Sequence, residues 1–428
     1  MRLTYNKANL ILAIVLFFMI VPTIRFFGFE TPFIYLLTPI GIIVFVFIIF
    51  GWIRIPFIVK PLIVLWLLVL VQILLSTFYS TINKLGYFSF PTDIIQYVVR
   101  FVFLISFIVF AFKGKISKEK FIKYFLVTLT AGMLIGVLQW ISWPGRELFI
   151  KLYPYRDGLE QISQLNRALY AIRMHGLAQF ATANGGLASF AFAYAYSIRK
   201  YYKRHRNLTM LLMILSVVNI FASQARAGML ALVFSIILFY FVDIKYERKG
   251  LKSTAYFIAI IASSSLILTF LYYRGNEFIV RNVARWVRLI EEGGGSRMTQ
   301  PQYFFSMMNG SDYLFGLSKP IINRTAITFG VEIEPINIFV TYGLVGFILQ
   351  YSIVILLLAY FYKKINKIAK DKAILSLLIA SFVSLFSYQI FSVAYYFFRE
   401  IRVGLFPWVL MGVAIGIYER ERIRGEKI

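Results

Sequence analysis

Long apolar runs recur along the whole chain and limit what it can fold into. A helix needs ~20 mostly apolar residues to cross the ~30 Å hydrocarbon core of a bilayer. About twelve runs approach this length, at residues 8–24, 33–50, 61–79, 94–112, 121–142, 178–198, 208–222, 227–243, 253–273, 337–361, 373–396 and 403–418. The pattern predicts an all-α polytopic membrane protein with about 12 transmembrane helices, forming one integral domain over residues 1–428.

The composition agrees with this class and argues against others. Hydrophobic residues make up 60% of the chain and charged residues only 15%, whereas a soluble domain has about 25% charged residues. A net charge of +26 would point to nucleic acid in a soluble protein. In a membrane protein, the excess of Lys and Arg in cytoplasmic loops explains such a charge. No nucleic-acid partner is therefore predicted, and a chain without cysteine has no disulfides.

The distribution of basic residues predicts the orientation. With a cytoplasmic N-terminus, the inner segments hold about 27 of the 45 basic residues and both termini are cytoplasmic. The inner side has about 18 Lys and 9 Arg, and the outer side about 3 Lys and 14 Arg. Because the planar guanidinium binds phosphate oxygens in pairs, the outer arginine excess indicates anion recognition. The alternative is that these arginines meet lipid headgroups or pair with outer acids.

Two substantial outer loops are expected, a first one at residues 143–183 and a large one at 274–336. Loops of this length are usually functional or disordered. The large loop contains a glycine hinge at residues 293–295 and six arginines, Arg274, Arg281, Arg285, Arg288, Arg297 and Arg324. Around residues 281–290 the arginines and the apolar residues alternate at helical spacing. This spacing predicts a helix lying on the membrane, which serves either phosphate binding or simple anchoring.

Four polar residues near the first outer loop and the next outer turn are candidates for an anion site. Arg226 lies at a tight helical hairpin among small residues, where a charge is costly unless paired or functional. Arg173 and His175 precede the span that contains Asn184. An arginine, a glycine and an amide at the start of a helix favour anion binding, because the first N–H groups of a helix are free.

Four further candidates lie in or next to the spans. Arg100 is inside the fourth apolar run, and it is either functional or paired with a structural carboxylate. Arg297 follows the glycine hinge, which either closes the loop on substrate or is an ordinary turn. Glu332 and Glu334 end the large loop, and a carboxylate there acts as a general base or pairs with an arginine. Nothing in the motifs calls for a metal or another cofactor, so none is predicted.

Four short motifs resemble those of a known superfamily, the bacterial O-antigen ligases and O-antigen or capsular polysaccharide polymerases. They cover roughly residues 170–350 and are Arg173-x-x-Gly176 with Asn184, Ser223-x-x-Arg226-Ala227, Ser296-Arg297 with Phe315-Gly316, and Glu332-x-Glu334 followed by Tyr342-Gly343-Leu344-Val345-Gly346. Each motif is short, and their order and expected membrane side carry the resemblance.

The resemblance implies an inverting, metal-independent glycosyltransferase of the inner membrane that acts at its outer face. The donor would be a glycan on undecaprenyl pyrophosphate, and the acceptor another glycan. Arg226 and Arg297 would bind the leaving pyrophosphate and act in catalysis with Glu332 and Glu334. Arg173, Arg288, Arg100, Asn184 and His175 complete the expected substrate site. A flippase and a chain-length regulator are the implied partner proteins.

One departure separates two branches of this superfamily. The ligases carry a histidine near the end of the large loop, where this chain has Glu332 and Glu334. Acidic residues there resemble the polymerase branch, so a polymerase is preferred and a ligase acting on lipid A-core is the alternative. A flippase or exporter of lipid-linked sugar is the alternative of another class. It would require charges along a central cavity and, usually, repeat symmetry.

Overall fold

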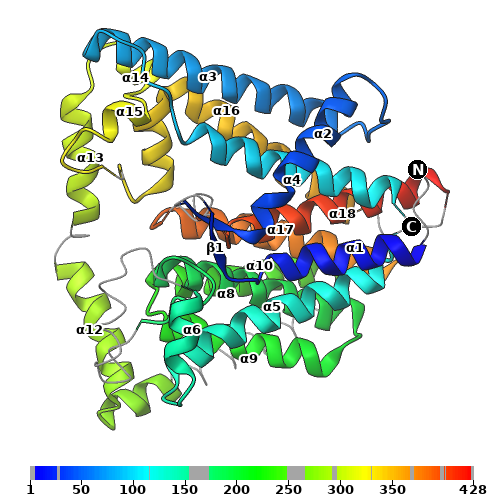
Figure 1. The fold of residues 1–428 in the computed structure, drawn as a ribbon. Helices are drawn as coiled ribbons and strands as arrows, with labels where there is room; N and C mark the ends of the chain where they lie inside the picture. Colours follow the sequence, from blue (N-terminus) through cyan, green and yellow to red (C-terminus); the bar gives the residue numbers. More distant parts are fainter. Residues whose placement is uncertain are drawn as a thin grey trace.

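Long helices running side by side make up most of the molecule in a computed structural model (Figure 1). The structure describes residues 5–26, 29–114, 116–153, 173–247, 266–291, 296–328, 330–366, 371–395, 400 and 402–425. The elements of the first half are α1 Tyr5–Phe18, β1 Thr23–Phe26, β2 Phe29–Pro32, η1 Phe33–Leu37, α2 Thr38–Ile49, α3 Val59–Leu85, α4 Ile94–Lys113, α5 Lys118–Trp140, α6 Arg146–Leu152, α8 Ala181–Ser197, η3 Ile198–Tyr202 and α9 Arg206–Ala222. Those of the second half are α10 Arg226–Glu247, α12 Glu277–Glu291, α13 Ser296–Met307, α14 Asp312–Phe315, α15 Lys319–Ile322, α16 Glu334–Ile365, α17 Lys372–Ser392 and α18 Leu405–Ile423.

The predicted apolar runs fold as helices of unequal length. Within the described residues, six helices are long and apolar enough to cross a membrane, namely α3, α4, α5, α10, α16 and α17. Three shorter apolar helices correspond to the runs at 8–24, 33–50 and 208–222. The runs at 178–198 and 403–418 form α8 and α18. Residues 253–265 of a further run, and the glycine hinge at 293–295, lie outside the described residues.

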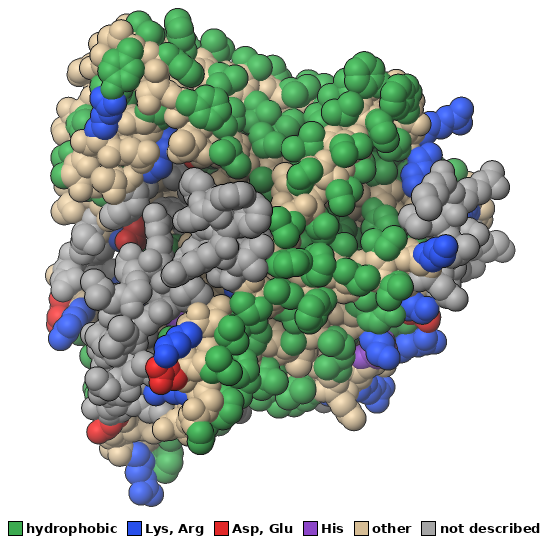
Figure 2. Space-filling model, in the orientation of Figure 1, with side chains coloured by type: hydrophobic (Ala, Val, Ile, Leu, Met, Phe, Trp, Pro, Cys, Tyr) green, Lys and Arg blue, Asp and Glu red, His purple; other side chains and the backbone are tan. Residues whose placement is uncertain are grey.

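The helical class is confirmed, with one short exception. Strands β1 and β2 pair as an antiparallel hairpin in which Arg25 lies opposite Glu30. On the face drawn in Figure 2, hydrophobic side chains form a broad band across the middle of the molecule. Helix α2 contributes the exposed side chains of Ile40, Ile43 and Ile49 to the surface. A helix that is apolar on all sides and still exposed is suited to lipid contact, so the chain is a polytopic membrane protein.

Glycine allows two of the long helices to touch through their backbones. A Cβ on Gly412 of α18 would lie 2.8 Å from the Leu104 carbonyl oxygen of α4, and one on Gly416 would lie 2.4 Å from that of Ile108. This spacing of four residues places both glycines on one face of α18. Small residues at such positions let membrane helices approach closely, since packing there depends on van der Waals contact.

Helix α16 is interrupted at Gly343, whose φ of 69° and ψ of −174° are not helical. The break leaves the carbonyl groups at the end of the first half-helix without helical partners. Leu317 N–H donates to the Val340 carbonyl at 2.8 Å, and the Gln72 side-chain amide donates to that of Tyr342 at 3.1 Å. A Cβ on Gly343 would lie 2.1 Å from the Leu314 carbonyl oxygen. Glycine is therefore required for the α14–α15 segment to pack against the break.

The two ends of the helix bundle differ in structure. The start of α1 and the end of α18 lie at the same end, at the right of Figure 1. Helices α12 and α13 lie at the opposite end and run across the directions of the long helices. The hydrophilic run at 274–334 is thus largely folded, because it forms α12, α13, α14 and α15. Helices α12 and α13 close one end of the bundle and carry four of the six loop arginines, namely Arg281, Arg285, Arg288 and Arg297.

Candidate functional site

A cluster of arginines lies at the end of the bundle that α12 and α13 cover. We call the following five residues the arginine cluster: Arg173, Arg226, Arg281, Arg285 and Arg297. Arg285 reports their proximity, because its pKa falls from 12.5 to about 10. Burial is the largest cause, and repulsion from the other four guanidinium groups adds to it. The cluster therefore holds a local surplus of positive charge, which an anion would neutralise.

Two hydrogen bonds join Arg285, on α12, to the turn at the start of α10 that carries Arg226. Arg226 is the first residue of α10, and its Nη1 donates to the Arg285 carbonyl oxygen at 2.7 Å. Arg285 Nη1 donates to Gln224 Oε1 at 2.6 Å. Gln224 has a φ of 51°, in the left-handed region that non-glycine residues seldom occupy. The turn before α10 is thus held in an uncommon conformation at the cluster, as is often found at functional sites.

Arg173 joins the same turn to the start of α8. Its Nε donates to the Ser223 carbonyl oxygen at 3.2 Å, and its Nη2 donates to Thr182 Oγ1 at 3.3 Å. Thr182 lies in the first turn of α8, which begins at Ala181. The N-termini of α8 and α10 therefore both lie beside the cluster. Helix N-termini carry partial positive charge and free N–H groups, which adds to the attraction for an anion.

The small residues around Arg226 serve helix packing. A Cβ on Gly228 would lie 2.8 Å from the Gly185 carbonyl oxygen, so α8 and α10 are in backbone contact. Ser189 Oγ donates to the carbonyl oxygens of Gly185 and Gly228, at 2.8 and 2.7 Å. Glycine and serine thus fix the two helix N-termini next to each other. The fixed spacing pre-organises the anion site.

Arg297 faces a carboxylate at the edge of the cluster. Its Nε donates to Glu332 Oε2 at 2.5 Å, and both side chains are partly exposed. The Glu332 N–H donates to Gln300 Oε1 at 2.9 Å, so α13 holds this glutamate from two sides. Because both side chains remain partly accessible, an anion that enters the cluster would compete with Glu332 for the Arg297 guanidinium.

His175 and Asn184 lie inside the protein and support the turn beneath the cluster. His175 is 4% exposed and bonded through Nε2 to the Tyr153 carbonyl oxygen at 2.8 Å. Burial lowers its pKa from 6.5 to about 4, so its ring is neutral near pH 7. Asn184 is fully buried, and its amide donates to Asn219 Oδ1 at 3.1 Å. Both predicted substrate ligands thus have internal partners.

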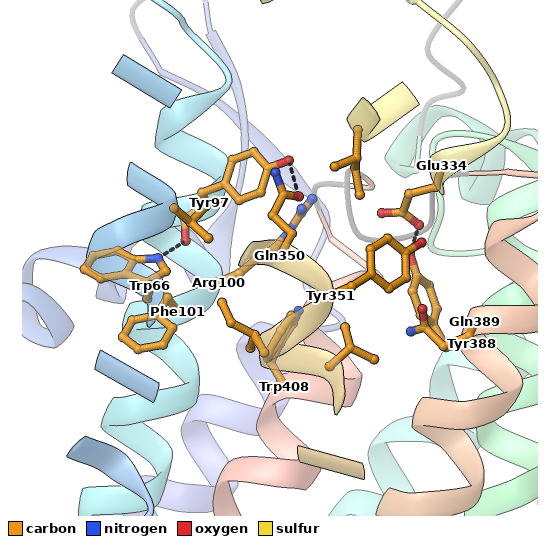
Figure 3. A pocket seen from close by; sticks show the side chains of 14 residues that line it. Trp66, Tyr97, Arg100, Phe101, Glu334, Gln350, Tyr351, Tyr388, Gln389 and Trp408 are labelled. Carbon is orange, nitrogen blue, oxygen red and sulfur yellow. Dashed lines mark hydrogen bonds between the residues drawn. The ribbon is translucent and has the colours of Figure 1, made fainter. Parts of the chain in front are cut away.

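Arg288 and Arg100 lie outside the cluster. Arg288 is exposed on α12, one turn beyond Arg285, and its binding role stays a prediction. Arg100 is buried in α4 and lines a cavity of about 80 Å³ together with Glu334 (Figure 3). Glu334 begins α16 and accepts a hydrogen bond from the Tyr388 hydroxyl. Glu332 and Glu334 therefore serve two different sites, although only one residue separates them.

Arg285 and Glu400 become prominent only in the structure. The sequence places Arg285 on one helical face with Arg288, and spacing alone does not tell which arginine turns inward. Glu400 is 4% exposed, and its Oε1 accepts a hydrogen bond from the Gln179 N–H. A single carboxylate between two apolar runs was the available signal for Glu400. It ties the segment before α18 to the segment before α8.

Comparison with known proteins leaves the site to be interpreted from its own geometry. No protein-family model matches the chain, and no curated protein shows significant similarity to it. Within the described residues, no group of three or more His, Asp or Glu side chains is placed to hold a metal ion. The geometry brings together five arginines and two helix N-termini, with one carboxylate at the edge, and this arrangement is a candidate anion site.

Proposed function

We propose that this protein is a membrane glycosyltransferase that joins glycan units carried on undecaprenyl pyrophosphate, an O-antigen or polysaccharide polymerase. The observation that carries the proposal is the arginine cluster, in which burial, and with it repulsion from the other four guanidinium groups, depresses the pKa of Arg285. A pyrophosphate carries several negative charges and fits such a site. The four sequence motifs that resemble the superfamily supply the glycan part of the proposal.

Helix α12 matches a donor that is both lipid and phosphate. Its arginines Arg281 and Arg285 belong to the cluster, whereas Val283, Val287 and Ile290 expose apolar side chains to the surroundings. An amphipathic helix of this kind lies at the boundary between lipid and headgroup. The pyrophosphate of a polyprenyl lipid resides at that same boundary. The helix would therefore contact the lipid with one face and the pyrophosphate with the other.

The proposed reaction is a displacement at the anomeric carbon. The oxygen of an acceptor hydroxyl forms the new glycosidic bond, and the bond from the anomeric carbon to the pyrophosphate oxygen breaks. The lipid pyrophosphate leaves as an anion, and the arginine cluster stabilises the charge that develops on it. Attack from the opposite face inverts the anomeric centre. The hydroxyl proton passes to a carboxylate acting as general base.

Glu332 is the better placed of the two predicted bases. It contacts Arg297, which belongs to the cluster, whereas Glu334 is buried and bonded to Tyr388. A pyrophosphate that binds Arg297 would compete with Glu332 for the guanidinium. Donor binding would thereby release the Glu332 carboxylate to accept the proton. This order would limit activation of the acceptor when no donor is bound.

The proposal includes a location and an orientation. We place the chain in the bacterial inner membrane with about twelve spans, both termini in the cytoplasm, and the loops at 143–183 and 274–336 outside. The lysine-rich inner segments support this orientation. Near the termini, the face in Figure 2 shows several basic side chains beyond the apolar band. The arginine cluster would then face the compartment in which lipid-linked glycans are polymerised.

The test uses purified protein in liposomes with a synthetic undecaprenyl-pyrophosphate repeat unit and no nucleotide sugar. A ladder of lengthening lipid-linked glycans is expected for the wild type, and none for Arg285→Gln. Arg324→Gln is the matched control, because Arg324 is an exposed arginine of the same hydrophilic run and bonds to the Tyr87 hydroxyl. Transfer only to added lipid A-core would indicate a ligase. Movement of the lipid across the bilayer without transfer would indicate a flippase.

A further inference from the structure

The cavity around Arg100 contains hydrogen-bond donors that lack partners. Arg100 is 5% exposed, and its Nε and Nη2 have no hydrogen-bond partner in the part of the chain that the structure describes. The side-chain Nε2 of Gln350, in α16, likewise has no hydrogen-bond partner among the described residues. Both residues line the cavity, where they lie close together in Figure 3. Buried donors without acceptors are costly, so their retention indicates a site that an acceptor group completes.

A carboxylate faces the same cavity from another side. Glu334 is 5% exposed, and the Tyr388 hydroxyl donates to its Oε2. Tyr97 Oη donates to Gln350 Oε1 at 3.0 Å and orients the amide. The cavity thus offers donors from Arg100 and Gln350 and an acceptor from Glu334. A phosphate would be repelled by the carboxylate, whereas sugar hydroxyl groups both donate and accept.

Aromatic rings form much of the remaining wall. Trp66 and Phe101 stack with their centroids 4.3 Å apart, and Trp408 and Tyr351 lie farther along the cavity. Binding sites for small organic molecules are usually apolar and aromatic, with a few polar groups that set orientation. The C–H face of a sugar ring matches such rings while its hydroxyls reach the polar groups. The volume of about 80 Å³ is smaller than a whole sugar ring, so the cavity takes one edge of a terminal residue with its hydroxyls and not a longer segment of glycan.

One residue that lines the cavity and one residue that contacts the arginine cluster lie only two positions apart in the sequence. Glu334 lines the cavity, and Glu332 bonds to Arg297 of the cluster. Two residues of extended chain span at most ~7 Å, so the main chain at Glu332, beside the cluster, lies within that distance of the main chain at Glu334, beside the cavity. We propose that the cavity binds the sugar residue of the acceptor that carries the attacking hydroxyl, with Arg100 and Gln350 donating to it and Glu334 accepting from it. This inference rests on the proposed polymerase function.

The test measures binding of the acceptor apart from catalysis. The probe is the lipid-free repeat-unit oligosaccharide, hydrolysed from the surface polysaccharide of the source bacterium and titrated into purified protein. Tryptophan fluorescence reports binding, since Trp66 and Trp408 line the cavity and are two of six tryptophans. Arg100→Gln is expected to weaken binding at least tenfold. Val354→Phe fills the cavity and keeps its charges, so it is also expected to weaken binding. This variant keeps the test decisive if Arg100→Gln fails to fold.

The arginine cluster supplies the opposing control. Arg285→Gln is expected to abolish chain elongation while the oligosaccharide still binds with wild-type affinity. Unchanged affinity in folded Arg100→Gln and Val354→Phe overturns the cavity assignment, even if the wild type makes a ladder. An active wild type that gives no binding signal also overturns it. If the wild type makes no ladder but binds the oligosaccharide through Arg100, the polymerase function fails and the sugar site stands.

Discussion

Two sites in this protein use arginine in opposite surroundings. In the arginine cluster, guanidinium groups come together from α10, α12, α13 and the segment before α8. Burial, and with it repulsion among these groups, lowers the pKa of Arg285 to about 10. In the cavity, a single arginine, Arg100, lies among aromatic rings across from Glu334. A surplus of charge selects an anion, whereas one donor group and one carboxylate in an apolar wall select a neutral polar ring. Under the two proposals, arginine would thus serve two kinds of recognition.

Glu332 and Glu334 connect these surroundings. One contacts Arg297 at the cluster, and the other faces the cavity. A donor at the first site and an acceptor at the second would meet at this short segment. The comparison therefore predicts that variants of the cluster impair use of the donor, whereas variants of the cavity impair binding of the acceptor.

The largest effect is expected at the cluster. Arg285→Gln should lower the rate of chain elongation by about 10³-fold, the upper range for loss of one group that stabilises a leaving anion. Arg226→Lys should also lose most of the elongation activity, because lysine keeps the positive charge but lacks the planar fork that binds two phosphate oxygens. The measurement is the elongation rate in liposomes at equal protein level. A wild-type rate in Arg285→Gln would remove the distinction between the two sites.

Exchange of the two glutamates should give different kinetic defects. Glu332→Gln should lower kcat by about 10²-fold, since a general base contributes at least that much. Glu334→Gln should instead raise KM for the acceptor about tenfold, as expected for loss of one charged hydrogen-bond partner. Steady-state kinetics with varied acceptor and saturating donor separates the two. Identical defects in both variants would place both carboxylates in one site.

Added pyrophosphate should stabilise the wild type through the cluster alone. Ligand at 100 times its Kd contributes about 2.7 kcal/mol to the free energy of unfolding. Thermal unfolding with inorganic pyrophosphate should therefore show a raised Tm in the wild type and in Arg100→Gln. Arg285→Gln should show no increase. An increase that depends on Arg100 and not on Arg285 would reverse the assignment of the two sites.

The smallest effect is expected from pH. Arg285 is protonated below a pKa of about 10 and loses its charge above it. Affinity for an anion is thus fully present near pH 8 and should fall severalfold by pH 11. Arg285→Gln should show a flatter profile over the same range, and Arg324→Gln a profile like that of the wild type. Calorimetric titration with pyrophosphate checks this, and a flat wild-type profile would contradict it.

Sequence reasoning predicted the helical class and many of the residues at the cluster, but not their pairing. Arg226 is predicted because a charge at a membrane boundary is costly without a purpose. Arg173 is predicted from the helix start that follows it, and Arg297 from the glycine hinge before it. Spacing on α12 placed Arg281, Arg285 and Arg288 on one face, yet which arginine turns inward depends on how α12 packs. His175 and Asn184 were expected to bind substrate, and they have internal partners instead. Polarity alone does not distinguish a buried support from an exposed ligand.

The sequence by itself determined that this is a helical membrane protein, because hydrophobicity and length act locally along each run. It also determined that arginines concentrate in the segments between certain runs. Only the tertiary structure decided that Arg173, Arg226, Arg281, Arg285 and Arg297 meet. Only the structure placed Arg100 in one cavity with Glu334, more than 200 residues away in the chain. Contacts of this range depend on the packing of α4 against α16 and α18, which a periodic pattern of single residues does not encode.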